Sequence, residues 1–344
     1  MKIANISERF LIYLVEQSFL IPLSSLLDYS LGIKARILGF LLSYNIDFSK
    51  SFLPIFTTVS GWYNILALFT VSITYYSLES MTNIGLAESL FKINIINKYS
   101  LPHHQQSIIL LFRNIIKSIF ITNLLNSLFI LRNKKYIQNL YDYKFNLFTI
   151  KDDGSDNKSL FFQYFYAALV SYYGMFFLLF LIYGLFVPTV AQPNSGITTS
   201  PSFNFLAFFN SVLRNNLELD LAKYILGGFS LFIGTFITLF SSNILETAML
   251  ASLYNAHGAS SFFKYVLPQF FPETMGYVFG IAISMVIADI MLSYLQSMLR
   301  NQKSEYFLKR TKELVINAGY YFALSITLLI VGALVESSLG ILNI

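Results

Sequence analysis

Long stretches without a charged residue constrain this chain more than any other feature. Residues 160–187 contain no charged side chain and are rich in aromatic and aliphatic residues. A helix of this length can cross the roughly 30 Å hydrocarbon core of a bilayer. Similar apolar stretches lie at 9–27, 61–78, 221–243, 244–264, 274–297 and 314–336. Because lipid leaves irregular backbone unsatisfied, we predict an all-α fold, a polytopic transmembrane helical bundle with re-entrant or interfacial helices.

The composition excludes several other classes of protein. Apolar residues make up 55% of the 344 residues and charged residues 12%, whereas soluble domains carry about 25% charged residues. The net charge is +5, but no basic patch with interleaved aromatics is present, so we expect no nucleic-acid partner. There is no cysteine, and the three histidines lack metal-binding spacing. We therefore expect neither a metal nor a cofactor.

The distribution of Lys and Arg predicts the orientation in the membrane. Segments 132–158 and 298–313 hold six and five basic residues, whereas Pro188 to Leu213 has no charged residue. Cytoplasmic loops are enriched in Lys and Arg, so the N-terminus is predicted to be cytoplasmic and the C-terminus outside. Within the uncharged segment, Phe205, Phe208 and Phe209 recur at helical spacing. This favours a short helix that lies in the outer interface or packs on its own bundle.

The first half of the chain contains an apolar run interrupted by charges and ends at a segment with the composition of a linker. The apolar run 108–131 is interrupted by Arg113 and Lys117. The remaining run of about 14 apolar residues is too short to cross, which favours a re-entrant or interfacial hairpin. The segment Asp152 to Asp156 has the composition of a linker. We therefore predict one module over 1–155, with two spans and the hairpin, and a five-span module over 156–344.

Acidic side chains within predicted spans are candidates for function. Glu246 and Asp289 interrupt apolar helices, and Asn243 lies one turn from Glu246. A carboxylate at a helix centre costs about 2.5–3.5 kcal/mol on insertion scales. These three residues could form a cation or proton site facing the bundle interior. Alternatively, Glu246 reaches the cytoplasmic interface and Asp289 is a hydrogen-bonded packing residue.

Polar residues at the predicted outer ends of helices suggest caps. Asn215, Asn216 and Asp220 precede the stretch that starts at 221, where their oxygens could cap free N–H groups or recognise an external ligand. Glu273 would favour the positive end of a helix from 274. Small residues for close helix packing are Gly227, Gly228, Gly234, Gly276 and Gly280.

The order of these residues carries a resemblance to a known family. The anchors are Asn215-Asn216, Gly228, Gly234-Thr235, Asn243, and Leu267-Pro268 with Glu273. Over roughly 160–340 the chain resembles the stage II sporulation protein M family of membrane proteins. In that family His-Gly usually follows the proline of the last motif, whereas this chain has Gln269 and Phe270.

The first half is similar to the RDD family of membrane proteins. Arg9 and Glu16 stand at the spacing of that family's Arg and Asp, and Arg113 and Asp142 fall where its later Arg and Asp are expected. The two resemblances together imply a fusion of two modules similar to proteins that are often linked as partners in membrane assemblies.

The motifs of common enzymes are missing from the sequence. It has no Gly-x-Ser-x-Gly elbow, phosphate-binding loop or dinucleotide fingerprint. We therefore predict a non-catalytic membrane scaffold or assembly module in the lipid bilayer, a homodimer or larger assembly that self-associates through its glycine-rich helix faces. The alternative is a cation, proton or lipid transporter or channel that uses Glu246 and Asp289.

Overall fold

The chain forms two compact units, Met1–Asn157 and Lys158–Ile344, called unit 1 and unit 2 below. The predicted linker at Asp152 to Asp156 falls next to this division. The computed structural model describes residues 2–3, 6–30, 59–82, 93–97, 103–117, 147–151, 160–186, 204–230, 232–300 and 304–342. Each unit is described by itself.

Unit 1 contains three described helices. They are α1 (Ile6–Ser30), α4 (Val59–Thr82) and α6 (His103–Lys117). The predicted spans 9–27 and 61–78 lie within α1 and α4. α4 packs against both α1 and α6.

The charges that interrupt the apolar run of α6 are on its buried face. Arg113 and Lys117 are buried, whereas Ile108 and Phe112 are exposed. The helix is therefore amphipathic, but its cations lie on the face that is buried in unit 1 and its large apolar side chains lie on the exposed face. Residues 118–131, the rest of the predicted hairpin, lie outside the described part of the chain.

Unit 1 also has a small antiparallel sheet that the sequence did not lead us to predict. Its strands are β1 (Lys2–Ile3), β2 (Ile93–Asn97) and β3 (Leu147–Lys151), in the order β1-β3-β2. Ile93 pairs with Lys151 and Asn97 with Leu147. Strand β2 is stabilised by a partner about 50 residues away, so local periodicity was a weak guide.

Unit 2 is helical throughout its described residues. Its elements are α9 (Leu160–Phe186), α10 (Phe205–Phe229), α11 (Ile233–Ser261), a short π-helical turn η3 (Phe262–Val266), α12 (Leu267–Arg300) and α13 (Ser304–Leu342). Among the described residues, three helical segments are long and apolar enough to cross a membrane: Phe162–Gly184, Leu267–Leu295 and Thr311–Leu339. The predicted helical membrane fold is confirmed, and the other predicted crossings remain predictions.

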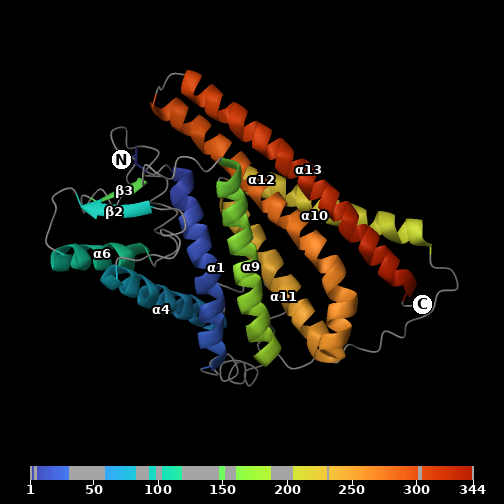
Figure 1. Ribbon diagram of the computed structural model, residues 1–344. Coiled ribbons are helices and arrows are strands. Elements are labelled where there is room, and N and C mark those ends of the chain that lie inside the picture. Colours follow the sequence, from blue (N-terminus) through green and yellow to red (C-terminus); the bar gives the residue numbers. More distant parts are fainter. Residues whose placement is uncertain are drawn as a thin grey trace. The chain divides into compact units, whose positions relative to one another are not determined.

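Contacts between the helices of unit 2 fix their directions. Tyr173 of α9 hydrogen-bonds Thr274 of α12, and Tyr164, earlier on α9, hydrogen-bonds Asp289, later on α12, so these two helices are antiparallel. α12 also packs along α13 and α10, which makes it the central helix of the unit (Figure 1).

The turn between α10 and α11 corrects two predicted spans. We predicted helices over 221–243 and 244–264, but α10 ends at Phe229 and α11 runs from Ile233 to Ser261. Phe232 adopts a left-handed conformation with φ of 73°, which non-glycine residues seldom adopt. The Ser230 hydroxyl accepts a hydrogen bond from the Gly234 N–H at 2.6 Å. A turn built around Phe232 leaves little signal in an apolar sequence.

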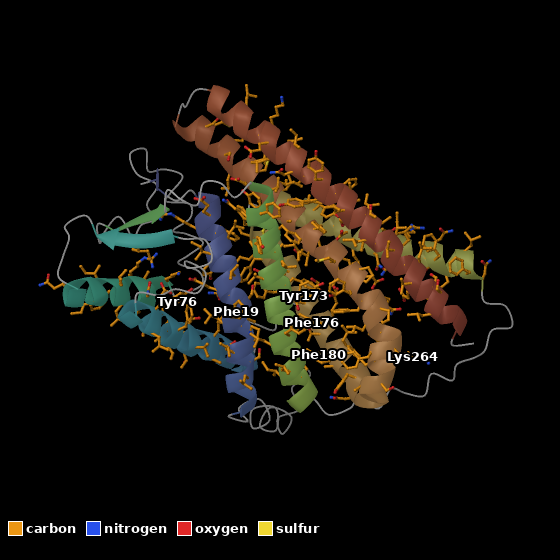
Figure 2. All side chains as sticks on the ribbon, in the orientation of Figure 1. Phe19, Tyr76, Tyr173, Phe176, Phe180 and Lys264 are labelled. Atoms are coloured by element: carbon orange, nitrogen blue, oxygen red, sulfur yellow. The ribbon has the colours of Figure 1, made fainter. Side chains whose placement is uncertain are left out.

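An aromatic cluster closes the end of unit 2 near η3. Figure 2 shows Tyr173, Phe176 and Phe180 following one another along α9. Phe176 and Phe270 have ring centroids 4.8 Å apart, and Phe180 and Phe262 5.6 Å apart. Such pairs add about 0.5–1.5 kcal/mol each beyond area burial. The cluster therefore holds α9 against η3 and the start of α12.

Candidate functional site

The core of unit 2 contains a polar network that joins α10 to α12. The Asn216 amide donates to Glu273 Oε1 at 2.9 Å, and its carbonyl oxygen accepts from the Tyr277 hydroxyl at 3.1 Å. Asn216 therefore bridges two side chains that are one helical turn apart on α12.

This geometry corrects the predicted caps. α10 begins at Phe205 and its N-cap is Asn204, whose side chain accepts from the Ala207 N–H at 3.2 Å. Asn215, Asn216 and Asp220 consequently lie in the interior of α10 and cap nothing, and Asn215 is exposed. The short interfacial helix that we predicted around Phe205 and Phe209 is the first part of α10.

The start of α12 differs from the prediction in the same way. This helix begins at Leu267, so Glu273 lies inside it and does not precede it. Glu273 Cγ would be 2.4 Å from a Cβ placed on Gly332 of α13. Pro268 is exposed in the first turn of α12. The glycine on α13 thus makes room for the Glu273 side chain.

Asp220 is the most deeply placed acid of the network, with 1% exposure. Its Oδ2 accepts hydrogen bonds from the hydroxyls of Tyr224 and Ser325, each at 2.6 Å. Ser325 also lies 3.0 Å from the Gly276 carbonyl oxygen, so Asp220 links α10 to both α12 and α13. Its Oδ1 has no hydrogen-bond partner within the described part of the chain. A Cβ on Gly280 would lie 2.6 Å from that oxygen.

Lys223 follows Asp220 by one turn and is also buried. Its ammonium lies 3.6 Å from the centroid of the Tyr277 ring, a cation–π contact. Asp220 and Glu246 attract it electrostatically, but it makes no direct ion pair with the carboxylates of the described residues. Sequence reasoning missed Lys223, although a lysine inside a predicted span and three residues from an aspartate is itself a signal.

A second polar group ties α9 to α11. The Asn243 amide donates to the Tyr172 carbonyl oxygen at 2.9 Å, and the Tyr172 hydroxyl donates to Glu246. Thr247 donates to the Asn243 carbonyl oxygen at 2.5 Å. The predicted pair Asn243 and Glu246 is thus brought together on one helix face, with Tyr172 as a partner that the sequence did not indicate.

Asp289 has different partners from Glu246. Its Oδ2 accepts from the Tyr164 hydroxyl at 2.5 Å and its Oδ1 from Ser293 at 3.3 Å. Tyr164 and Tyr172 are eight residues apart on α9, which is about 12 Å at 1.5 Å per residue. The two predicted acids therefore bind hydroxyls at different levels of the bundle, and only Glu246 of the two interacts electrostatically with Lys223.

One further acid joins the network from α13. Glu336 and Glu273 of α12 interact electrostatically. Sequence reasoning missed Glu336 because it stands at the end of the last predicted span, where a carboxylate at the interface was the simpler expectation.

Most of the predicted packing glycines lie directly against side chains of other helices in the same chain. A Cβ on Gly227 would lie 1.8 Å from Ser284 Oγ, one on Gly228 2.5 Å from Ile287 Cγ2, and one on Gly276 2.9 Å from Leu329 Cδ2. Gly280 faces Asp220, and Gly234 is buried beside the turn. These glycines permit close approach between helices of one chain, so they are not available as a face for a second copy.

Unit 1 has its own buried polar group. Lys117 of α6 and Glu16 of α1 form a salt bridge of 2.9 Å, with side-chain exposures of 6% and 0%. The Tyr76 hydroxyl of α4 donates to Glu16 at 2.8 Å, so the three helices meet at this carboxylate. Of the other predicted residues, Arg113 donates to Asn114 at 2.8 Å.

Arg9 and Asp142 are the remaining predicted residues of unit 1. Arg9 is half-buried near the start of α1. Asp142 lies outside the described residues. Among the residues that are described, no group of three or more His, Cys, Asp or Glu side chains could hold a metal ion.

Comparison with known proteins supports the resemblance of the second half. Residues 173–339 match the model of the family described as Stage II sporulation protein M. The matched range takes in the second half of α9 and nearly all of α13, and it includes Asn216, Asp220, Asn243 and Glu246 but not Tyr172. The similarity of residues 1–155 to the RDD family gains no support. No curated protein and no solved structure matches the chain.

Proposed function

We propose, from the match of residues 173–339 to the Stage II sporulation protein M family, that this membrane protein is a non-catalytic assembly module. The observation that carries the proposal is the way in which unit 2 uses its polar residues. Asn216, Asp220 and Asn243 each bond to another helix of the same unit. Groups used in this way stabilise a fixed bundle whose outer faces are free to bind other proteins.

The outer face of α13 is the best supported contact surface for a second copy. Only 28% of the most apolar segment of α13 is buried, against 67% for α12. The large exposed apolar residues of α13 in its candidate span are Val315, Ile316, Tyr320, Phe322, Leu324, Val331 and Leu334. Self-association through this face replaces our earlier expectation that the glycine faces would dimerise.

Cysteine cross-linking in membranes tests this proposal, because the natural chain has no cysteine. Leu334 is 42% exposed, whereas its neighbour Ala333 is fully buried. We expect Leu334→Cys to give an oxidised dimer of two chains and Ala333→Cys to give none. Native mass spectrometry of the unmodified protein should then show at least two copies or a bound partner.

Two results would contradict the assembly proposal. One is an absence of cross-links at every exposed position of α13 that is tried, together with a monomer free of partners in native mass spectrometry. The other is equal cross-linking of Leu334→Cys and Ala333→Cys, which would mean random collision in the membrane. In either case α13 would face lipid alone.

A transport function is the second candidate, favoured by the acids within unit 2. Glu246 accepts a hydrogen bond from Tyr172 and interacts electrostatically with Lys223, as a residue of an ion or proton path would. We expect any flux of protons or cations into liposomes to fall at least about tenfold in Glu246→Gln. In Asp289→Asn, at a different level of the bundle, we expect a smaller loss. Flux that is equal in wild type and Glu246→Gln would remove this residue from a transport path.

A further inference from the structure

The core of unit 2 holds more carboxyl groups than cations. Four acids, Asp220, Glu246, Glu273 and Glu336, interact with one another or with the single ammonium of Lys223. A buried carboxylate without a compensating charge is very costly, and such a group binds a proton instead. Among the described residues of this network one ammonium stands against four acids, an imbalance of charge that favours bound protons.

The hydrogen bonds show where a proton can be exchanged. Glu273 accepts a hydrogen bond from Asn216, and Glu246 accepts one from Tyr172. Asp220 differs because its Oδ2 accepts from two hydroxyls, while its Oδ1, at 1% exposure of the residue, has no hydrogen-bond partner among the described residues. An unpartnered carboxylate oxygen in such a place marks an incomplete site.

The groups around Asp220 come from every helix that packs on α10. Lys223 and Tyr224 belong to α10 itself, and Glu246 lies on α11. α12 contributes Tyr277, and α13 contributes the Ser325 hydroxyl. Lys223 is the only cation among these groups, and it forms no direct ion pair with Asp220.

We propose that Asp220 is a proton-binding site in the core of unit 2, in which Oδ1 takes the proton and Lys223 controls its occupancy. The ligand is a proton from the aqueous phase, and the only bond formed is O–H. A neighbouring ammonium favours the carboxylate, and removal of that ammonium favours the acid. The site does not depend on the assembly proposal, because no contact with a second chain enters it.

Infrared spectroscopy of the full chain in liposomes tests the site directly. Protonated carboxyl groups absorb apart from carboxylates, and ¹³C labelling of the aspartate carboxyls separates them from glutamates. We expect a titrating aspartic acid band in the wild type that is lost in Asp220→Asn. A wild-type band that persists unchanged in Asp220→Asn, or an Asp220 that stays ionised throughout the titration, would overturn the proposal.

A charge-removal pair keeps the test decisive should Asp220→Asn fail to fold. Lys223→Met is expected to move the midpoint of the band upward by at least about one pH unit, since an opposite charge at close range shifts a carboxyl by about 1–3 units. Lys264→Met removes an exposed cation from η3 and should leave the midpoint unchanged (Figure 2). Equal midpoints in the two variants would overturn the proposal. Loss of cross-linking at α13 would leave this result untouched.

Discussion

Replacing Lys117 by methionine is expected to destabilise unit 1 by about 3–5 kcal/mol, because it leaves a buried carboxylate without its counter-charge. Glu16 is fully buried and forms its 2.9 Å salt bridge with Lys117. The Tyr76 hydroxyl also donates to this carboxylate, but it supplies a hydrogen bond and no charge. Denaturant unfolding in detergent, followed by a probe in unit 1, measures the loss.

A double variant separates the charge from the packing. In Glu16→Gln with Lys117→Met both charges of this ion pair are removed together, so most of the lost stability should return. The exposed pair Arg214 and Glu218, an i,i+4 ion pair of 2.7 Å on α10, is the matched control. Its removal should change the unfolding curve too little to measure. A double variant as unstable as Lys117→Met would show that the lost contact is apolar packing.

Gly228→Ala is expected to destabilise unit 2 by about 1–3 kcal/mol, the usual cost of overpacking a core. The new methyl carbon would lie 2.5 Å from Ile287 Cγ2 and 2.7 Å from its Cβ. Rotation of the isoleucine side chain cannot move its own Cβ, so α10 and α12 must separate. The measurement is the midpoint of thermal or denaturant unfolding in detergent.

Gly319→Ala is the matched control for this substitution. Gly319 is an exposed glycine of α13, and a Cβ placed there meets nothing within 4 Å. The alanine should therefore leave stability unchanged or raise it by up to about 1 kcal/mol, the difference in helix propensity. If both alanines had the same effect, the approach of α10 to α12 at Gly228 would not be as close as described.

The sequence predicted those elements that depend on length and polarity alone. The uncharged stretch 160–187 is α9, which spans Leu160–Phe186, because a run of this kind has few other stable conformations in lipid. The stretches 274–297 and 314–336 likewise lie inside α12 and α13. In each case the local sequence carries the whole signal.

The turns and the partners could not be predicted in the same way. The break between α10 and α11 depends on the left-handed conformation of Phe232, a residue type that rarely adopts it. Glu16 was singled out in the sequence, but its partner Lys117 is 101 residues away. Polar residues within spans were found, whereas the pairing between them depends on tertiary packing.

The bonds of Asp220 have a consequence for the order in which the protein is made. α10 leaves the ribosome before α12 and α13, yet Asp220 depends on a hydroxyl of Ser325, which is 105 residues later in the chain. Until α12 and α13 are synthesised, Asp220 and Lys223 of α10 lack the partners that those helices provide, Ser325 and Tyr277. We therefore expect the nascent helix to enter the lipid interior only after Ser325 has been synthesised.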